Sequence, residues 1–63
     1  MVEKEIVIKF LNKTVVLELT ETNLFYKGCV KEVTDSSLFL ELLNGKDVAI
    51  ALSEIRFIRE VDG

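Results

Sequence analysis

The chain contains no histidine, no proline and no tryptophan, and it has a single cysteine, Cys29. One cysteine cannot form an intrachain disulfide, and without histidine or a second thiol we expect no structural zinc site. The absence of histidine also leaves no imidazole to activate Cys29, which is expected to fill space in a strand. The glutamates are scattered, so no paired-carboxylate site is expected. The sequence predicts no catalytic residues, no metal and no cofactor, and therefore no enzyme.

Basic residues are also scarce. Eleven acidic and eight basic residues give a net charge of −3, whereas nucleic-acid modules usually carry a basic footprint. The lysines are spread singly, so a basic patch requires the fold or an assembly to gather them. No apolar run approaches the length of a membrane span, and the N-terminus lacks the order of a signal peptide. We expect a soluble, cytoplasmic protein with no membrane partner.

With 63 residues, the chain has room for one domain, residues 1–63. A chain this short buries only about 60% of its unfolded surface, and ordering each residue costs roughly 1.5 kcal/mol. Small domains usually gain the missing stability from disulfides or structural metals, and we expect neither here. Self-association is the remaining source of stability, so the chain is expected to form a homo-oligomer through its edge strands.

Apolar spacing predicts a short N-terminal helix followed by five strands. In residues 2–11, Val2, Ile6, Val7, Phe10 and Leu11 form an apolar face at helical spacing, whereas Ile6, Ile8 and Phe10 alternate as in a strand. We favour the helix, with the strand left open. The strands are predicted at Thr14–Thr20, Leu24–Thr34, Leu38–Leu43, Asp47–Leu52 and Ile55–Val61. The residues expected to be buried in them are Val15, Leu17, Leu19, Leu38, Leu40, Leu42, Val48, Ile50, Leu52, Ile55, Phe57 and Ile58.

Two glycines carry structural information. Asn44-Gly45 is typical of a type I′ hairpin turn, because both residues tolerate positive φ. Gly28 lies inside the second predicted strand, where glycine marks a bend or a close backbone approach. Such a bend allows one strand to serve both halves of a small barrel. The predicted fold is mainly β, with a short N-terminal helix and a five-stranded, strongly bent antiparallel small barrel.

Three segments carry a family resemblance: FLNKTVVLEL, FYKGCV and IALSEI. In this order, from about Ile6 to Ile58, the chain resembles the Sm-like (LSm/Hfq-type) family of small barrels, with Gly28 at the strand-bending glycine. The resemblance implies rings in which the last strand pairs with the fourth strand of the next subunit, and binding of single-stranded RNA. NGKDV with IALSEI also resembles the SH3-like C-terminal domain of the bacterial ribosome maturation factor.

The candidate RNA-binding residues are Lys27, Lys31, Asp35, Ser36 and Ser37. The lysines can contact phosphates, and the polar turn matches the ligand loop implied by the resemblance. However, the aspartate and asparagine of the family motif are replaced by Thr34 and Leu38. The alternative reading is that solvated lysines protect strand edges and that the three polar residues form a plain turn.

Apolar residues on both faces of Leu38–Leu43 suggest a contact with the helix or with a neighbouring subunit. Phe39, Leu43 and Phe57 are the predicted interface residues. Phe25 and Tyr26 either stack on bases or pack within the protein. Two functions remain open. The first is an Sm-like oligomeric module that binds single-stranded RNA or nucleotides, and the second is a protein-interaction or oligomerisation module without nucleic acid.

Overall fold

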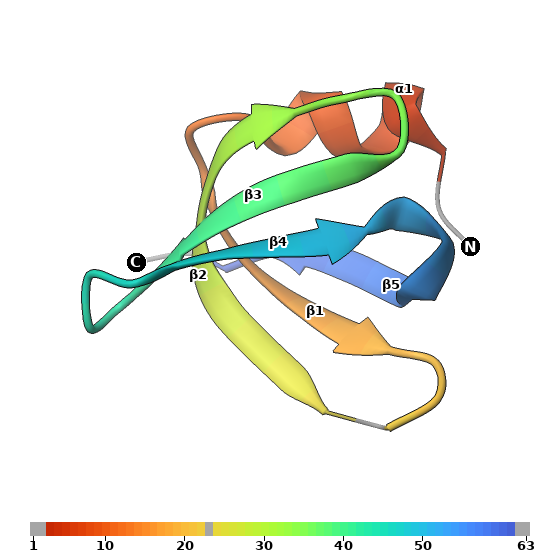
Figure 1. Ribbon diagram of the computed structural model, residues 1–63. Helices are drawn as coiled ribbons and strands as arrows, with labels where there is room; N and C mark the ends of the chain where they lie inside the picture. The colour runs from red at the N-terminus through yellow and green to blue at the C-terminus, as the bar shows by residue number, and fades with distance from the viewer. Residues whose placement is uncertain (1–2, 23, 62–63) are drawn as a thin grey trace.

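The computed structural model describes residues 3–22 and 24–61, and it confirms a mainly β chain with a short N-terminal helix (Figure 1). The strands are β1 (Thr14–Leu19), β2 (Phe25–Val33), β3 (Ser37–Leu42), β4 (Asp47–Ala51) and β5 (Ile55–Glu60). They are preceded by helix α1 (Lys4–Val7) and the 3₁₀ helix η1 (Ile8–Phe10), and η2 (Leu52–Glu54) joins β4 to β5. The part of the helix prediction that concerns Val2 lies outside the described residues.

The N-terminal segment is helical, as the spacing of its apolar residues predicts. Of the predicted helical face, Val7 is fully buried and Phe10 packs against the core, whereas Ile6 and Leu11 are exposed. The helical segment ends before Asn12, whose φ of 66° is a left-handed conformation that asparagine tolerates. The Asn12 N–H then donates to the carbonyl oxygen of Val30 at 2.7 Å. The segment therefore lies across one end of the curled sheet and is tied to β2 (Figure 1).

All five strands form one antiparallel sheet in the order β4-β3-β2-β1-β5. The long strand β2 pairs with β1 through its first half and with β3 through its second half, and the two pairings overlap at Gly28 and Cys29. Gly28 lies opposite Val15 on one side and Leu42 on the other. A Cβ atom at Gly28 would collide with the carbonyl oxygen of Glu41 and lie 3.1 Å from Leu40 Cγ. The predicted close backbone approach at Gly28 is confirmed.

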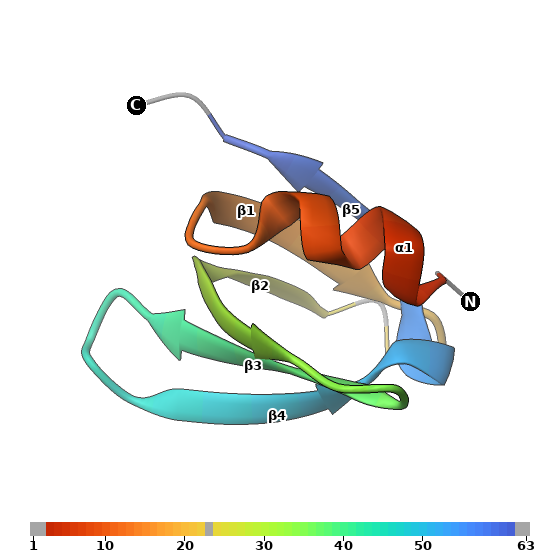
Figure 2. The same cartoon turned by 90° about the horizontal axis from the view of Figure 1, so that it is seen from above.

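A bulge helps β2 to curve. Val30 lies opposite Leu40 and Glu32 lies opposite Phe39, so Lys31 is an extra residue on the β2 side. A bulge bends its strand and increases the local twist. β2 accordingly runs as a long arc that joins the two halves of the sheet (Figures 1 and 2).

Alternating residues of every strand, together with the helix, supply the core. Each fully buried leucine, isoleucine or valine contributes roughly 1.5–3 kcal/mol. The buried residues are Val7, Val15, Leu17, Val30, Leu38, Leu40, Ile50, Leu52 and Ile55. Leu19, Leu42 and Val48 are partly buried against them. For β1, β3, β4 and β5 the sequence thus predicts the inward residues correctly, with one exception in β5.

The exception is Phe57, whose predicted burial is wrong because its side chain is 38% exposed. Leu19 lies opposite Ile55 and Glu18 lies opposite Phe57, so Arg56 has no residue across from it. This bulge shifts the alternation of β5 by one position. Ile55 and Ile58 therefore face the core, and Phe57 faces outward beside Glu18.

The hairpin between β3 and β4 also differs from its prediction. A type I′ turn requires positive φ at both Asn44 and Gly45, but only Gly45 has it, with φ of 88°. The Gly45 N–H donates to the Leu42 carbonyl oxygen at 2.9 Å, and the Lys46 N–H donates to Asn44 Oδ1 at 3.0 Å. The Leu42 N–H donates to the Lys46 carbonyl oxygen and closes a loop of residues 43–45, with glycine in the left-handed position, a common alternative to the two-residue hairpin.

β4 and β5 are the two edges of the sheet. Within residues 3–22 and 24–61 neither strand pairs with the other, so the curled sheet is not closed by strand pairing. The η2 turn carries the chain from one edge to the other, and Leu52 in this turn is buried although the sequence places it at the end of a strand. Among the described residues no helix is long and apolar enough to cross a membrane.

Candidate functional site

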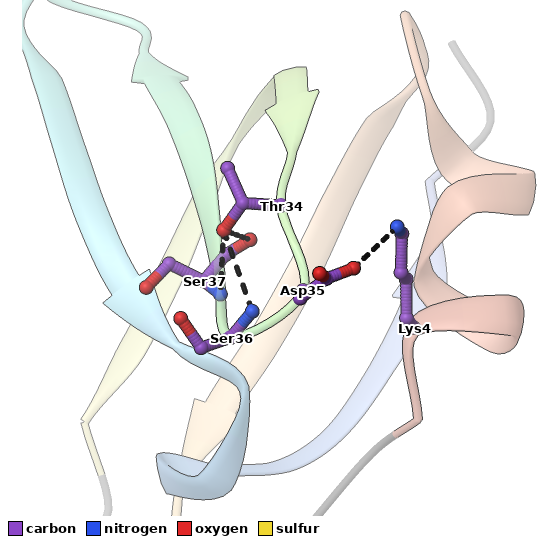
Figure 3. A network of polar contacts seen from close by, with 5 residues as sticks. All are labelled: Lys4, Thr34, Asp35, Ser36 and Ser37. Carbon is purple, nitrogen blue, oxygen red and sulfur yellow. Dashed lines mark hydrogen bonds and ion pairs between the residues drawn. The ribbon is translucent and has the colours of Figure 1, made fainter.

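The predicted ligand loop is the turn between β2 and β3, and its geometry is set by Thr34 (Figure 3). Thr34 Oγ1 accepts hydrogen bonds from the Ser37 N–H at 3.0 Å and the Ser36 N–H at 3.4 Å. The Thr34 hydroxyl also lies 3.2 Å from the Ser37 carbonyl oxygen, which accepts the Thr34 N–H at 2.8 Å. These contacts hold the turn in one conformation and leave the Ser36 side chain exposed.

Asp35, in the same turn, is paired with the N-terminal helix. The Lys4 ammonium donates to Asp35 Oδ1 at 2.7 Å (Figure 3). This hydrogen bond, and then the charge of Lys4, holds the pKa of Asp35 below its usual range, and the same contact raises the pKa of Lys4. Asp35 thus fastens the turn to α1 in this structure, and a role in binding RNA remains a prediction.

Lys27 and Lys31 are both exposed on β2 but differ in their contacts. Lys31 Nζ lies 3.3 Å from Glu41 Oε1. The hydrogen bond to Glu41, reinforced by the charge of Glu41, raises the pKa of Lys31. Lys27 makes no ion pair within the described part of the chain. The predicted site residues are therefore separated: Asp35, Ser36 and Ser37 share one turn, Lys31 lies at the bulge, and Lys27 lies in the half of β2 that pairs with β1.

Lys27 instead belongs to a second group, which we call the outer aromatic face: Phe25, Lys27, Phe57 and Arg59. Phe25 and Phe57 lie on either side of Glu18 of β1, with ring centroids 6.4 Å apart and an interplanar angle of 71°. The next row of the sheet places Lys27 and Arg59 on either side of Val16. This face combines two exposed rings with two cations.

Charge is divided across the outside of the sheet. One half of the outer surface is formed by β1, β5 and the first half of β2. It carries three basic residues, Lys27, Arg56 and Arg59, and one acidic residue, Glu18. The other half is formed by β3, β4 and the second half of β2. It carries three acidic residues, Glu32, Glu41 and Asp47, and one basic residue, Lys31. A chain with a net charge of −3 therefore has one basic and one acidic outer surface.

The predicted interface residues lie in different places. Phe39 is half-buried on the outer side of β3 opposite Ala49, and Leu43 is 77% exposed at the tip of the β3–β4 hairpin. Phe57 belongs to the outer aromatic face. Tyr26 points inward opposite Leu17 and packs against the core, so of the two aromatics considered for stacking only Phe25 is exposed.

Sequence reasoning names Phe57 as an interface residue but also places it inside by strict alternation along β5, and it gives Arg59 no role. No local signal in IRFIRE marks the bulge at Arg56, which depends on pairing with β1. Within residues 3–22 and 24–61, no three histidine, cysteine, aspartate or glutamate side chains are grouped so that they could hold a metal ion. Comparisons with protein-family models, curated proteins and solved structures gave no match for this chain.

Proposed function

We propose that this chain is a self-associating, Sm-like binding module whose copies join by strand addition between the edge of β4 and the edge of β5. The observation that carries the proposal is the sheet order, which leaves one side of each of these strands without a strand partner among the described residues. Open edges favour pairing with another chain. A small domain without disulfides also gains stability from such pairing.

The hydrogen-bond pattern identifies which groups of β4 are available. The Leu42 N–H donates to the Lys46 carbonyl, and the Leu52 N–H donates to the Ser36 carbonyl. In an antiparallel ladder, bonded and non-bonded pairs alternate. Ala49, opposite Phe39, therefore falls at a non-bonded position. Its N–H and C=O point away from β3, toward the open edge.

Charge favours a head-to-tail arrangement. β5 carries Arg56 on its outer side, whereas β4 carries Asp47 beside Glu41 of β3. Joining β4 of one copy to β5 of the next brings unlike charges together, and joining two identical edges brings like charges together. A head-to-tail contact generates a ring when its rotation closes and a filament when it does not.

The test is Ala49→Pro, because proline removes only the N–H that points toward the open edge. Sedimentation velocity at micromolar concentration should give wild-type species of several times 7.2 kDa and a monomer for A49P with an unchanged far-UV spectrum. Ala49→Thr, which keeps the N–H, should assemble as wild type. A wild-type monomer at tens of micromolar, or an A49P assembly equal to wild type, would contradict the proposal.

In this proposal the ligand is single-stranded RNA, in keeping with the resemblance described above. An assembly brings together one 34–37 turn and one set of β2 lysines from each copy, which raises the local density of phosphate contacts. Binding of oligo(U) or oligo(A) should fall as salt rises. Absence of binding to either polymer at low salt would contradict the RNA part and leave self-association standing.

A second candidate, a protein-interaction module without nucleic acid, is favoured by Leu43. A leucine with 77% of its surface exposed at a hairpin tip contributes little to folding but is suited to a contact with another protein. Leu43→Asp should leave the urea midpoint within error of wild type and weaken any assembly that uses the tip. An L43D protein that assembles normally would remove the basis for this candidate.

A further inference from the structure

The outer aromatic face contains exposed rings that the fold does not bury. Phe25 is 61% exposed and Phe57 is 38% exposed, although the two rings contact each other edge to face. Phe25 therefore keeps most of its surface exposed despite this contact. An aromatic ring exposed to this extent is available for stacking against a flat partner.

The adjacent cations are also available. Among the basic residues, Lys4, Lys13, Lys31 and Arg56 each make an ion pair. Lys27 and Arg59 make none within residues 3–22 and 24–61, and they flank Val16 directly beside the aromatic row. Side chains two positions apart on a strand are separated by about 6.8 Å. A ligand resting on the rings therefore has both cations within reach.

We propose that the outer aromatic face is a binding site for single-stranded nucleic acid, with bases stacking on Phe25 and Phe57 and phosphates contacting Lys27 and Arg59. The site lies outside the 34–37 turn and does not depend on it. Nucleic acid is favoured over an apolar partner because the rings and cations alternate in adjacent rows. A stacked base and its phosphate require this combination, and an apolar partner would leave Lys27 and Arg59 covered without counter-charges.

Charge complementarity supports the same ligand. The face is locally basic on a chain of net charge −3, so an anionic polymer is attracted to this portion of the sheet and repelled by the acidic portion over β3 and β4. The one carboxylate within the face, Glu18, is only 14% exposed and lies 3.9 Å from Arg56. The Glu18 carboxylate is therefore partly shielded from solvent, and its negative charge is partly balanced by Arg56.

The test measures fluorescence anisotropy of labelled oligo(dT), oligo(U) and oligo(A) with the full chain at several salt concentrations. Phe25→Leu and Phe57→Leu keep an apolar side chain and remove the ring. Each should weaken binding by about 5- to 150-fold, the effect expected for losing one base stack. Lys27→Gln should weaken binding and reduce the slope of log K against log salt by about 0.7. Lys9→Gln, the same charge change on the exposed helical segment, is the matched control and should bind as wild type.

The binding of a variant is interpreted only if its circular dichroism spectrum matches that of the wild-type protein. Wild-type binding that survives both phenylalanine substitutions but is lost in Ser36→Ala or Lys31→Gln would overturn this site and leave the RNA ligand of the proposed function intact. No binding by the wild-type protein would overturn both. If the phenylalanine substitutions instead abolish self-association without any nucleic acid present, the face is an interface between copies and the inference is wrong.

Discussion

At the scale of single residues, Gly28 has the clearest structural requirement. It lies where β2 changes partners, and the backbone of Glu41 occupies the space of a side chain. Its requirement for glycine comes from this close approach, whereas Gly45 is needed for its φ of 88° and has open space around it. The two glycines therefore serve different physical purposes.

Gly28→Ala should lower the free energy of unfolding by about 1–3 kcal/mol, because the added methyl group forces β2 and β3 apart. Urea denaturation measures the change. Lys27→Thr, at the exposed neighbouring position, should stay within about 0.5 kcal/mol of wild type. A Gly28→Ala protein as stable as the Lys27→Thr protein would show that the sheet tolerates a side chain at this position.

The contact between Lys4 and Asp35 predicts a pH effect. The folded pKa of Asp35 is lowered, so its stabilising contribution is present above the unfolded pKa and is lost as pH falls through the folded pKa. Asp35→Asn should therefore lower the urea midpoint slightly at pH 7, and this difference should shrink as pH falls through the folded pKa of Asp35 and the carboxylate becomes protonated. Glu21→Gln, in the exposed β1–β2 turn, is the control. A midpoint difference between D35N and wild type that persists unchanged in acid would contradict the assignment.

At the scale of elements, the two bulges decide which side chains face outward. The bulge at Lys31 lets β2 curve, and the bulge at Arg56 reverses the facing of the residues that follow it in β5. Both arise from pairing between strands, so neither is visible in the sequence of one strand. The outer aromatic face exists because of the second bulge.

Lysine substitutions test the facing of β5. Ile55→Lys buries a charge in the core and should prevent folding, whereas Phe57→Lys places the charge in solvent and should leave a folded protein with a modest loss of stability. Circular dichroism and thermal melting distinguish the two. An unfolded F57K protein beside a folded I55K protein would mean that β5 follows strict alternation after all.

At the scale of the whole molecule, the open edges and the small core act together. Within residues 3–22 and 24–61 the two edge strands of the curled sheet do not pair with each other, so each has backbone groups along its outer edge without a strand partner. If copies satisfy these groups mutually, stability becomes a function of concentration. The same sheet then accounts for both stability and assembly.

The proposed assembly therefore predicts that raising the wild-type concentration tenfold raises the Tm, because association stabilises only the folded state. Differential scanning calorimetry at two concentrations measures this, and the A49P protein, which lacks the edge N–H, should melt at one temperature at both. A wild-type Tm that is independent of concentration would count against assembly under the conditions of the scan.

Much of the fold follows from the sequence by itself. The apolar alternation in TVVLEL and LFLEL identifies the strands and their buried side chains, because a strand with one buried face must alternate with a period of two. Helical spacing indicates the N-terminal turn, and the glycine inside FYKGCV predicts the close approach. Each of these features depends on residues within a few positions of each other, so local chemistry is sufficient.

Only the tertiary structure decided the facing of Phe57, the pairing of Lys4 with Asp35, and the grouping of Phe25, Lys27 and Arg59 on one surface. These features depend on the register between segments that are distant in the chain, and a one-residue bulge in that register changes which side chains meet. Whether the sheet closes also depends on the tertiary structure, because it is set by the position of β4 relative to β5. Short-range pattern determines what the strands bury, and long-range register determines what they display.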